Sequence, residues 1–448
     1  MINKLLKKFR VKKHDLADVF TPSTSAKLTF VERNDLDDQI NRALIMPGMQ
    51  LIVYGHSGSG KTTITQNILV GKQTPFIVSN CILDTTVNDI ILDAFDKLNP
   101  YYTSEKETKV KAKISAELKA SYAALDTTIK SELSSELSEK KQRALPIQLT
   151  AQRLAEFLGA AGVVWIIEDF HKVAKSERQK LSQILKIFVD VSNKYRTVKV
   201  IAIGAVDTAR EVVNYDSELN NRISEIHVPL LTKEELEGII NKGEKLLNIY
   251  FDPKIHEEVI HFSNSLAAIC HHLCFSICWN NSVERTLRIK KKLKTAALLD
   301  AVRDYLKQNS DSFKETLDRA LKPRAGKFDK TKKILQCFCD ADKHELTHRE
   351  LLSVKGNKKT YGSQLEEYLR LLTTADYGEI LRFDDNSGKY SFSNPFFKAY
   401  TIMYFSIEER DQSIHTIDLD IDEIMKYFNI TIDNVKLKVE RVAPKSDE

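Results

Sequence analysis

Short apolar runs alternate with helix-like segments over the first half of the chain. Between 30 and 230, runs rich in β-branched residues occupy 50–54, 75–81, 163–167, 198–203 and 223–228. Fully apolar runs of this length, separated by helical segments, are typical of parallel strands buried on both faces of a sheet. The pattern therefore predicts an α/β domain at 30–230, in which helices cover both sides of a parallel sheet in three layers.

One segment, at about 103–142, interrupts this alternation. It contains neither Gly nor Pro and is rich in Lys, Glu, Ser and Ala. Its apolar residues recur every three or four positions, which places one on each helical turn: Val110, Ile114, Leu118, Tyr122, Leu125, Ile129, Leu133 and Leu137. So narrow a seam fits a helical insertion that rests on its own domain, or a helix that contacts another chain.

The second half of the chain has a different organisation. From 231 to 322 the pattern is helical throughout, and it starts at a capping box of Thr232 and Glu235. From 323 to 405, three helical segments are followed by two alternating runs around Asn386-Ser387-Gly388, which predict a hairpin. This order predicts a helical domain and then a winged helix, flanked by a basic lead-in at 1–29 and a tail at 406–448 without a clear period.

Composition adds only broad limits. The 448 residues are 42% hydrophobic and 29% charged, which is typical of a globular protein with two or three domains. No apolar run is long enough to cross a bilayer, so no membrane partner is expected. The basic start lacks the features of a secretory signal, and six cysteines suit a reduced cytoplasm. A net charge of +5 does not by itself indicate nucleic-acid binding.

The most specific motif lies at 55–62, where the sequence reads Gly-x-x-x-x-Gly-Lys-Thr between a predicted strand and a predicted helix. Glycines let the backbone N–H groups approach phosphate oxygens, Lys61 offers a positive charge to the β- and γ-phosphates, and Thr62 offers a hydroxyl to Mg²⁺. The candidate nucleotide-binding residues of this loop are Gly55, His56, Ser57, Gly58, Ser59, Gly60, Lys61, Thr62 and Thr63.

Two acids, Glu168 and Asp169, follow the apolar run at 163–167. Open α/β sheets bind their ligands at the carboxyl ends of the strands, which is where these carboxylates are expected. One carboxylate is needed to hold Mg²⁺ and its waters, and the other can orient or deprotonate an attacking water. The loop and the acids together predict a nucleotide site.

These two motifs resemble the AAA+ and STAND classes of P-loop ATPases, with an origin-recognition-like architecture. The acidic strand of those classes usually ends in Asp-Glu, and Ile166-Ile-Glu-Asp-Phe-His-Lys-Val173 resembles it with the acids reversed. The resemblance places Glu168 with Thr62 at the magnesium position and Asp169 at the base position. It implies ATP and Mg²⁺ as cofactors, and no Asn-Lys-x-Asp signature for guanine is present. Because Asp is shorter than Glu, a switch that binds nucleotide without hydrolysing it stays an alternative.

Further positions follow from the same resemblance. Asp207 ends the run 198–207, where the class has a polar sensor residue. Arg222 precedes the fifth strand, where the class carries an arginine that reaches a neighbour's γ-phosphate; its other reading is an arginine that caps the strand entry. Val31 and Arg33 lie in a segment similar to one that borders the adenine, and 231–322 resembles the helical lid of the class.

Three further groups of residues have a structural as well as a functional interpretation. Cys270, Cys274 and Cys278 are four residues apart and are interpreted as buried small residues of a lid helix rather than as metal ligands. The basic run at 285–294 is interpreted as an exposed helix face, with contact to a phosphate backbone as the alternative. The helix expected at 361–370 carries two acids and one base, which favours protein contact, whereas the DNA-binding alternative relies on lysines in the preceding loop: Lys355, Lys358 and Lys359.

The sequence therefore predicts an ATP-binding and ATP-hydrolysing switch that forms a homo-oligomer on ATP binding and regulates a protein partner. Two alternatives stay open at this point. One is a DNA-binding initiator or transposition-type regulator that uses the winged helix. The other is an accessory ATPase of an antiviral or toxin system.

Overall fold

The computed structural model describes residues 13–103, 114–134, 149–204, 219, 221–322, 328–341, 343–354, 357, 361, 364–385, 387–428, 430–433 and 436–439. These residues form two compact units. The first unit takes the described residues of Met1–Asn248, Ser265–His271 and Glu284–Ile289. The second takes those of Ile249–Asn264, His272–Val283 and Lys290–Glu448.

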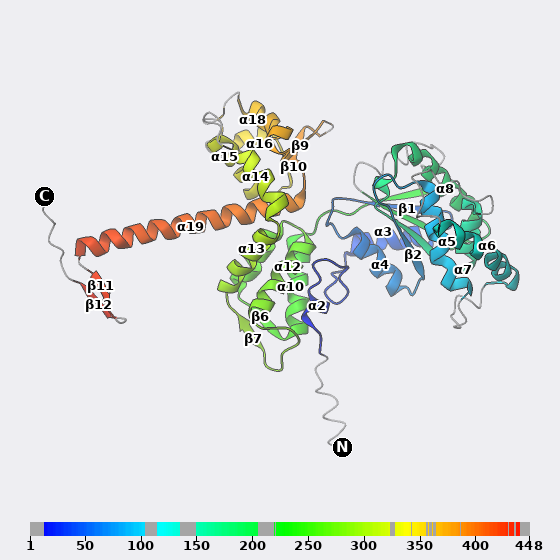
Figure 1. Cartoon of the computed structure of the whole chain (residues 1–448), viewed down its shortest axis with the longest axis horizontal. Helices are drawn as coiled ribbons and strands as arrows, with labels where there is room; N and C mark the ends of the chain where they lie inside the picture. The colour runs from blue at the N-terminus through cyan, green and yellow to red at the C-terminus, as the bar shows by residue number, and fades with distance from the viewer. Residues whose placement is uncertain are drawn as a thin grey trace, which may run out of the picture. The chain divides into compact units, whose positions relative to one another are not determined.

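A five-stranded parallel sheet forms the centre of the first unit (Figure 1). Its strands follow the order β2-β3-β4-β1-β5, so that β1 lies between β4 and β5. Each strand falls on one of the apolar runs, which confirms the predicted α/β fold class. The strands are β1 (Gln50–Tyr54), β2 (Phe76–Asn80), β3 (Val164–Glu168), β4 (Val200–Gly204) and β5 (Ile223–His227).

Alternating side chains of the strands pack into a separate core on each face of the sheet. Leu51 and Val53 belong to the core that includes α3 (Asn34–Ile45) and α4 (Lys61–Gly71). Ile52 belongs to the opposite core, which is formed with four other helices. These are α5 (Val87–Thr103), α6 (Ala116–Ser134), α7 (Ala151–Ala161) and α8 (Arg178–Val191). The central strands β1, β3 and β4 are therefore buried on both faces, as their apolar runs predict.

The described part of the helical insertion, α6 (Ala116–Ser134), packs against α5 of its own unit. The seam residues Tyr122, Leu125 and Ile129 are buried in the core of the α5 face. The Tyr122 hydroxyl donates to the backbone oxygen of Phe95, and its ring stacks on that of Tyr102 at 4.5 Å. Of the two readings of the seam, the structure supports the insertion that rests on its own domain.

The first unit also contains the start of the predicted helical domain. Helix α10 (Lys233–Leu247) begins at the predicted capping box, because the Thr232 hydroxyl accepts from the backbone of Glu235 and the Glu235 carboxylate accepts from that of Thr232. Helix α2 (Leu16–Val19) contacts α10, and a Cβ at Gly243 would lie 2.1 Å from the Phe20 ring. Among the described residues of this unit, two short 3-10 helices follow β3: η3 (Phe170–Lys172) and η4 (Lys175–Glu177).

The region from 231 to 322 is not helical throughout, which corrects the sequence prediction. A parallel pair of short strands, β6 (Ile249–Phe251) and β7 (Lys291–Leu293), lies within the second unit. The basic run at 285–294 therefore includes a strand and is not a helix face, because backbone pairing with β6 and burial of Leu293 override its helical composition. The surrounding helices are α11 (Pro253–Ser263), α12 (Ala267–Asn280, up to His271 in the first unit), α13 (Ala296–Gln308), η6 (Ser310–Lys314) and α14 (Glu315–Leu321).

The rest of the second unit contains the predicted hairpin. Strands β9 (Leu381–Asp384) and β10 (Lys389–Phe392) pair antiparallel, and β10 also pairs with β8 (Glu345–Thr347). The helices before the hairpin are α15 (Phe328–Asp340), α16 (His348–Ser353), α18 (Leu365–Leu371) and η8 (Ala375–Tyr377). Lys355, Lys358 and Lys359 lie outside the described residues, and the winged helix as a binding module stays a prediction.

The region expected to be an irregular tail from 406 starts inside a helix. Helix α19 (Pro395–Phe428) continues through this position and is followed by the antiparallel strands β11 (Ile430–Asp433) and β12 (Lys436–Val439). Within α12, Cys270, Cys274 and Cys278 are fully buried, as their spacing predicted. None of the helices in the described part of the chain is long and apolar enough to span a bilayer.

Candidate phosphate-binding site

The glycine-rich loop runs from the carboxyl end of β1 into α4. Gly55 has a φ of 155°, and a Cβ there would lie 2.2 Å from the backbone oxygen of Val228, so no side chain fits. Gly58 and Gly60 have φ values of 80° and 86°, a conformation that glycine adopts without steric cost. A glycine-rich loop between β1 and α4, at the carboxyl ends of a five-stranded parallel sheet, gives the first unit the P-loop NTPase fold.

Lys61 is the first residue of α4, and its ammonium group folds back over the loop. Its Nζ donates to the backbone oxygens of Gly55 at 3.0 Å and His56 at 2.8 Å. Burial lowers the pKa of Lys61, and the nearby carboxylates of Asp169 and Glu168 oppose this effect. The cation is therefore held at the loop by groups that a phosphate can replace.

Thr62 and Glu168 meet at the predicted magnesium position. The Thr62 hydroxyl donates to Oε2 of Glu168 at 3.0 Å, which joins the start of α4 to the end of β3. Glu168 is buried, and burial is the main reason that its pKa is raised; the Thr62 hydrogen bond opposes this and the Asp169 charge adds to it. Its Oε1 is buried without a hydrogen-bond partner in the described part of the chain. An orphaned carboxylate oxygen beside a hydroxyl is a suitable donor set for a hard cation.

Asp169 follows in a left-handed conformation, with a φ of 55° and a ψ of 35°. Its Oδ2 lies 2.8 Å from Nζ of Lys172, which is on η3. Both side chains are about half exposed, at 47% for Asp169 and 42% for Lys172. The residue at the predicted base position is therefore accessible and is held by a lysine three residues later.

Arg33 and Val31, the two predicted residues upstream of the loop, both line the cavity beside it. The Nε of Arg33 donates to Oε1 of Glu235 at 2.8 Å, and its guanidinium also donates to the backbone oxygens of Pro229 at 3.0 Å and Ser59 at 3.4 Å. Arg33 thereby connects the phosphate loop to the segment after β5 and to the capping box of α10. Val31 lies beside it and contacts α10, where a Cβ at Gly238 would be 3.1 Å from Val31 Cγ2.

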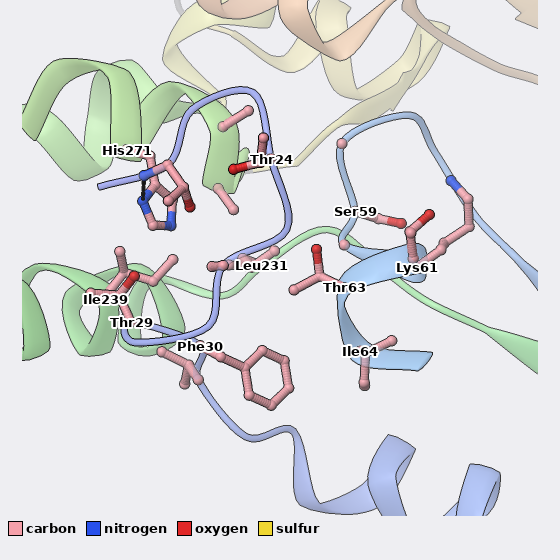
Figure 2. Close-up of a pocket in the computed structure, with 18 of the residues that line it drawn as sticks. Thr24, Thr29, Phe30, Ser59, Lys61, Thr63, Ile64, Leu231, Ile239 and His271 are labelled. Carbon is pink, nitrogen blue, oxygen red and sulfur yellow. Dashed lines mark hydrogen bonds between the residues drawn. The ribbon is translucent and has the colours of Figure 1, made fainter. Parts of the chain in front are cut away.

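A cavity of about 300 Å³ extends from the phosphate loop within the first unit. Figure 2 shows Ser59 and Lys61 on one side of it, His271 and Ile239 on the other, and Phe30 and Leu231 between them. Its size is at the lower limit of pockets for small ligands. The loop end of the cavity is lined by Ser57, Gly58, Ser59, Gly60, Lys61, Thr62 and Thr63, with Glu168 and Asp169.

Arg222 lies away from this cavity. Its backbone oxygen accepts from the Gln50 N–H at 2.9 Å, at the amino ends of β1 and β5, whereas the phosphate loop follows their carboxyl ends. The Arg222 side chain is exposed. In its own chain it lies at the opposite edge of the sheet from Lys61, so any role at a γ-phosphate requires a second copy. Asp207 lies outside the described residues.

Sequence reasoning missed three partners of the predicted residues. Lys172 lies three residues after Asp169, and this spacing is typical of an ion pair. Glu235 was assigned only to the capping box, although it also binds Arg33. His271 lines the cavity and accepts from the Thr21 N–H at 3.0 Å, and no sequence motif marks it.

No family model and no curated protein matches the chain. Among solved structures, it is similar to the Walker-type ATPase PABY2304 of Pyrococcus abyssi, with 14% identity over 83% of this chain and 96% of that one and a TM-score of 0.47. It is also similar to Cdc6p of Pyrobaculum aerophilum (15% identity, 88% and 98% covered, TM-score 0.43). A third is the Aeropyrum pernix ORC1 protein in complex with DNA (11%, 87% and 96%, 0.41). Similarities this low do not transfer an activity or a partner to this chain.

Proposed function

We propose that the first unit binds ATP with Mg²⁺ and hydrolyses it, and that the bound nucleotide controls self-assembly and regulation of a partner protein. The observation that carries this proposal is the hydrogen bond between Thr62 and Glu168, 3.0 Å long, beside the ammonium group of Lys61. A hydroxyl and an ammonium group at the start of one helix, with a carboxylate from the neighbouring strand, are the groups that phosphate and its metal require.

Each residue of the loop has a separate task in this proposal. Lys61 exchanges the carbonyls of Gly55 and His56 for phosphate oxygens, to which it binds more strongly because they are charged. Thr62 and Glu168 would hold the Mg²⁺, whose charge offsets that of the β- and γ-phosphates when it is bound. Glu168 must be ionised for this, which its burial resists.

Asp169 is the residue proposed to act on water. Its carboxylate is half exposed and lines the cavity beside Glu168, so a water molecule can reach it. The carboxylate would orient that water and accept its proton as the water attacks the γ-phosphorus. The ion pair with Lys172 competes with this task, which favours slow turnover.

The switch function is supported by the contacts of Arg33. This one side chain binds the carbonyl of Ser59 in the phosphate loop and the carboxylate of Glu235 at the start of α10. A shift of the loop on nucleotide binding would therefore change the contacts of α10. Exposed Arg222, at the opposite edge of the sheet, is the residue proposed to complete the site of a neighbouring copy.

The decisive experiment measures ATP binding and turnover in single variants. Lys61→Ala should lose ATP binding, and Asp169→Asn should bind ATP but lose turnover. Lys72→Ala, an exposed lysine that follows the other end of α4, is the matched control and should behave as the unaltered protein. Turnover in Lys61→Ala and Asp169→Asn that equals that of the control would exclude this site as the source of the activity.

Binding of duplex DNA is a second candidate function. Lys290, Lys291 and Lys294 are exposed in the second unit, and a basic strand or loop can contact phosphates as well as a helix can. Affinity for duplex DNA that falls with rising salt, and that falls further in a Lys290→Ala, Lys291→Ala double variant, would support it. Equal affinity of the variant and the unaltered chain at low salt would exclude these lysines as the contact.

A further inference from the structure

A buried histidine lies across the cavity from the phosphate loop. His271 is only 2% exposed and belongs to α12, whose first residues Ala267 and Ala268 also line the cavity. Its Nδ1 accepts a hydrogen bond from the backbone N–H of Thr21 at 3.0 Å, drawn as a dashed line in Figure 2. The ring is therefore fixed in orientation by a segment 250 residues away in sequence.

This contact also determines where the ring carries its proton. A backbone N–H can only donate, so Nδ1 must be the acceptor, and a neutral imidazole then carries its hydrogen on Nε2. Burial acts in the same direction, because it lowers the pKa of His271 to about 4. At neutral pH His271 presents a single donor, Nε2–H.

Two polar atoms at this end of the cavity are buried without a hydrogen-bond partner among the described residues. They are Nε2 of His271 and the hydroxyl oxygen of Thr21, and both residues line the cavity. Buried polar groups in native proteins are nearly always paired, so two orphaned atoms beside one cavity are available to a ligand that enters it. One of them is an obligatory donor, and the other can accept.

We propose that His271 and Thr21 recognise the base of the nucleotide as adenine. The Nε2–H of His271 donates to a ring nitrogen, and the Thr21 hydroxyl accepts from the 6-amino group. Adenine places an acceptor nitrogen next to its amino group on each of the two edges that carry it, at N1 and at N7. The inference rests on the proposed nucleotide binding and adds the groups that select the base.

The surroundings of His271 favour adenine over guanine. The side chains of Phe30, Val31, Leu231 and Ile239 line this part of the cavity and offer no hydrogen bonds. Guanine would bring an N1–H, a 2-amino group and a 6-oxo group. On its N1 edge the N1–H would face the His271 donor, and on its N7 edge the 6-oxo group would replace the amino donor opposite Thr21. Each polar group left unpaired in such surroundings weakens binding.

Both atoms are buried from solvent, so a base can contact them only when the segment that covers them moves. The segment that carries Thr21 is suited to this, because its residues Ser23 and Thr24 are exposed while Phe20 before it is fully buried. We therefore expect ATP to slow hydrogen exchange of the Thr21 amide more than inorganic tripolyphosphate does.

The test compares ligands on the full, unaltered chain by titration calorimetry. The ligands are ATP, 1-deaza-ATP, 7-deaza-ATP, GTP and inorganic tripolyphosphate. One of the two deaza analogues lacks the nitrogen that receives the His271 hydrogen, so it should bind roughly 5- to 100-fold more weakly than ATP. GTP should also bind more weakly than ATP, and tripolyphosphate should bind through the loop alone.

Variants then assign the effect to the side chain. His271→Phe should weaken ATP binding by a similar factor and abolish the difference in affinity between ATP and the deaza analogue. It should leave the affinity for tripolyphosphate unchanged. His271→Gln, which keeps an acceptor and an N–H donor, should restore most of the affinity. The control is His272→Phe, at a histidine whose ring contacts Tyr305 at 5.1 Å, and it should leave ATP affinity unchanged.

Failure of the inference and failure of the proposed function give different results. Equal affinities of the unaltered chain for ATP and both deaza analogues would overturn the inference, and the analogue series does not depend on whether a variant folds. The proposed function would survive that result if Lys61→Ala abolished binding of both ATP and tripolyphosphate. An unaltered chain that binds neither ligand would overturn both.

Discussion

The carboxylate of Asp169 is held by Lys172, with 2.8 Å between Oδ2 and Nζ. Both residues follow β3, and Lys172 belongs to the short helix η3 that Asp169 starts. The residue proposed to act on water is therefore already engaged in an ion pair. Because both side chains are about half exposed, the pair is weak and can open without a large cost.

Removing the partner should free the carboxylate. We expect Lys172→Met to raise ATP turnover by roughly two- to fivefold, the range that a partly exposed pair worth less than ~1 kcal/mol allows. Steady-state phosphate release measures this. Lys180→Met is the control, because Lys180 pairs with Glu177, away from the acids. A fall in turnover for Lys172→Met would assign Lys172 to substrate binding instead.

Glu168 should make stability depend on pH in a direction opposite to that of most carboxylates. Burial raises its folded-state pKa above the ordinary value of 4.5. Its contribution to stability is then complete below the unfolded pKa and is lost as pH rises through the folded one. We expect the unaltered chain to lose stability relative to Glu168→Gln as pH rises from about 4 to 7.

The measurement is the free energy of unfolding of both proteins across this pH range, with a chelator present. Addition of Mg²⁺ and nucleotide should stabilise the unaltered chain and not Glu168→Gln, because the metal binds the ionised carboxylate. A difference that is constant with pH would contradict the proposed burial of this group. Glu345→Gln, at a partly exposed carboxylate, serves as the control.

The Arg33–Glu235 pair should contribute to stability as well as to coupling. Only 9% of the Arg33 side chain and 18% of the Glu235 side chain are exposed. Arg33→Met leaves the Glu235 carboxylate and three backbone oxygens without this donor, so we expect a loss of about 2 kcal/mol or more in the free energy of unfolding. Glu235→Gln is the milder partner change, because glutamine also completes a capping box. Denaturant unfolding of both single variants and the double variant gives their coupling energy, and a value near zero would exclude a direct interaction.

Two glycines of the loop should respond differently to the same substitution. Gly55→Ala places a Cβ against the Val228 backbone oxygen, so the loop cannot keep its position and ATP binding should be lost. Gly60→Ala meets no protein atom within 4 Å, so in the chain without nucleotide it suffers mainly from its φ of 86°, which costs about 1–2 kcal/mol. Gly71→Ala, at the end of α4, is the control and should be neutral or slightly stabilising. Melting temperature and ATP affinity measure both effects; equal affinities of Gly55→Ala and Gly60→Ala would contradict the steric argument.

The parts of the site that could be predicted from sequence are local. The loop at 55–62 and the acids after β3 each follow a buried strand. A buried strand of about five apolar residues can be recognised from that run alone. Contacts between distant segments leave no such pattern. Thr21 and His271 are 250 residues apart, and neither residue type is unusual at its position. The basic run was misassigned for a similar reason, since its pairing with β6 is a tertiary contact that composition does not encode.

Arg222 provides the sharpest test of assembly. It lies at the amino end of β5, at the edge of the sheet opposite the phosphate loop, and its side chain is exposed. If it acts at the γ-phosphate of a neighbouring copy, Arg222→Ala should keep its ATP affinity and lose turnover by on the order of 10³-fold. Lys61→Ala should lose turnover because its own loop cannot bind ATP.

Mixing these two variants should restore activity. An intact loop from Arg222→Ala then meets an intact arginine from Lys61→Ala, so the mixture forms competent sites that neither variant forms alone. Phosphate release from an equimolar mixture, measured over a range of protein concentrations, should exceed the sum of the two separate rates and rise with concentration. A mixture whose rate equals that sum at every concentration would show that Arg222 does not act across an interface, and would favour the reading in which it caps the entry of β5.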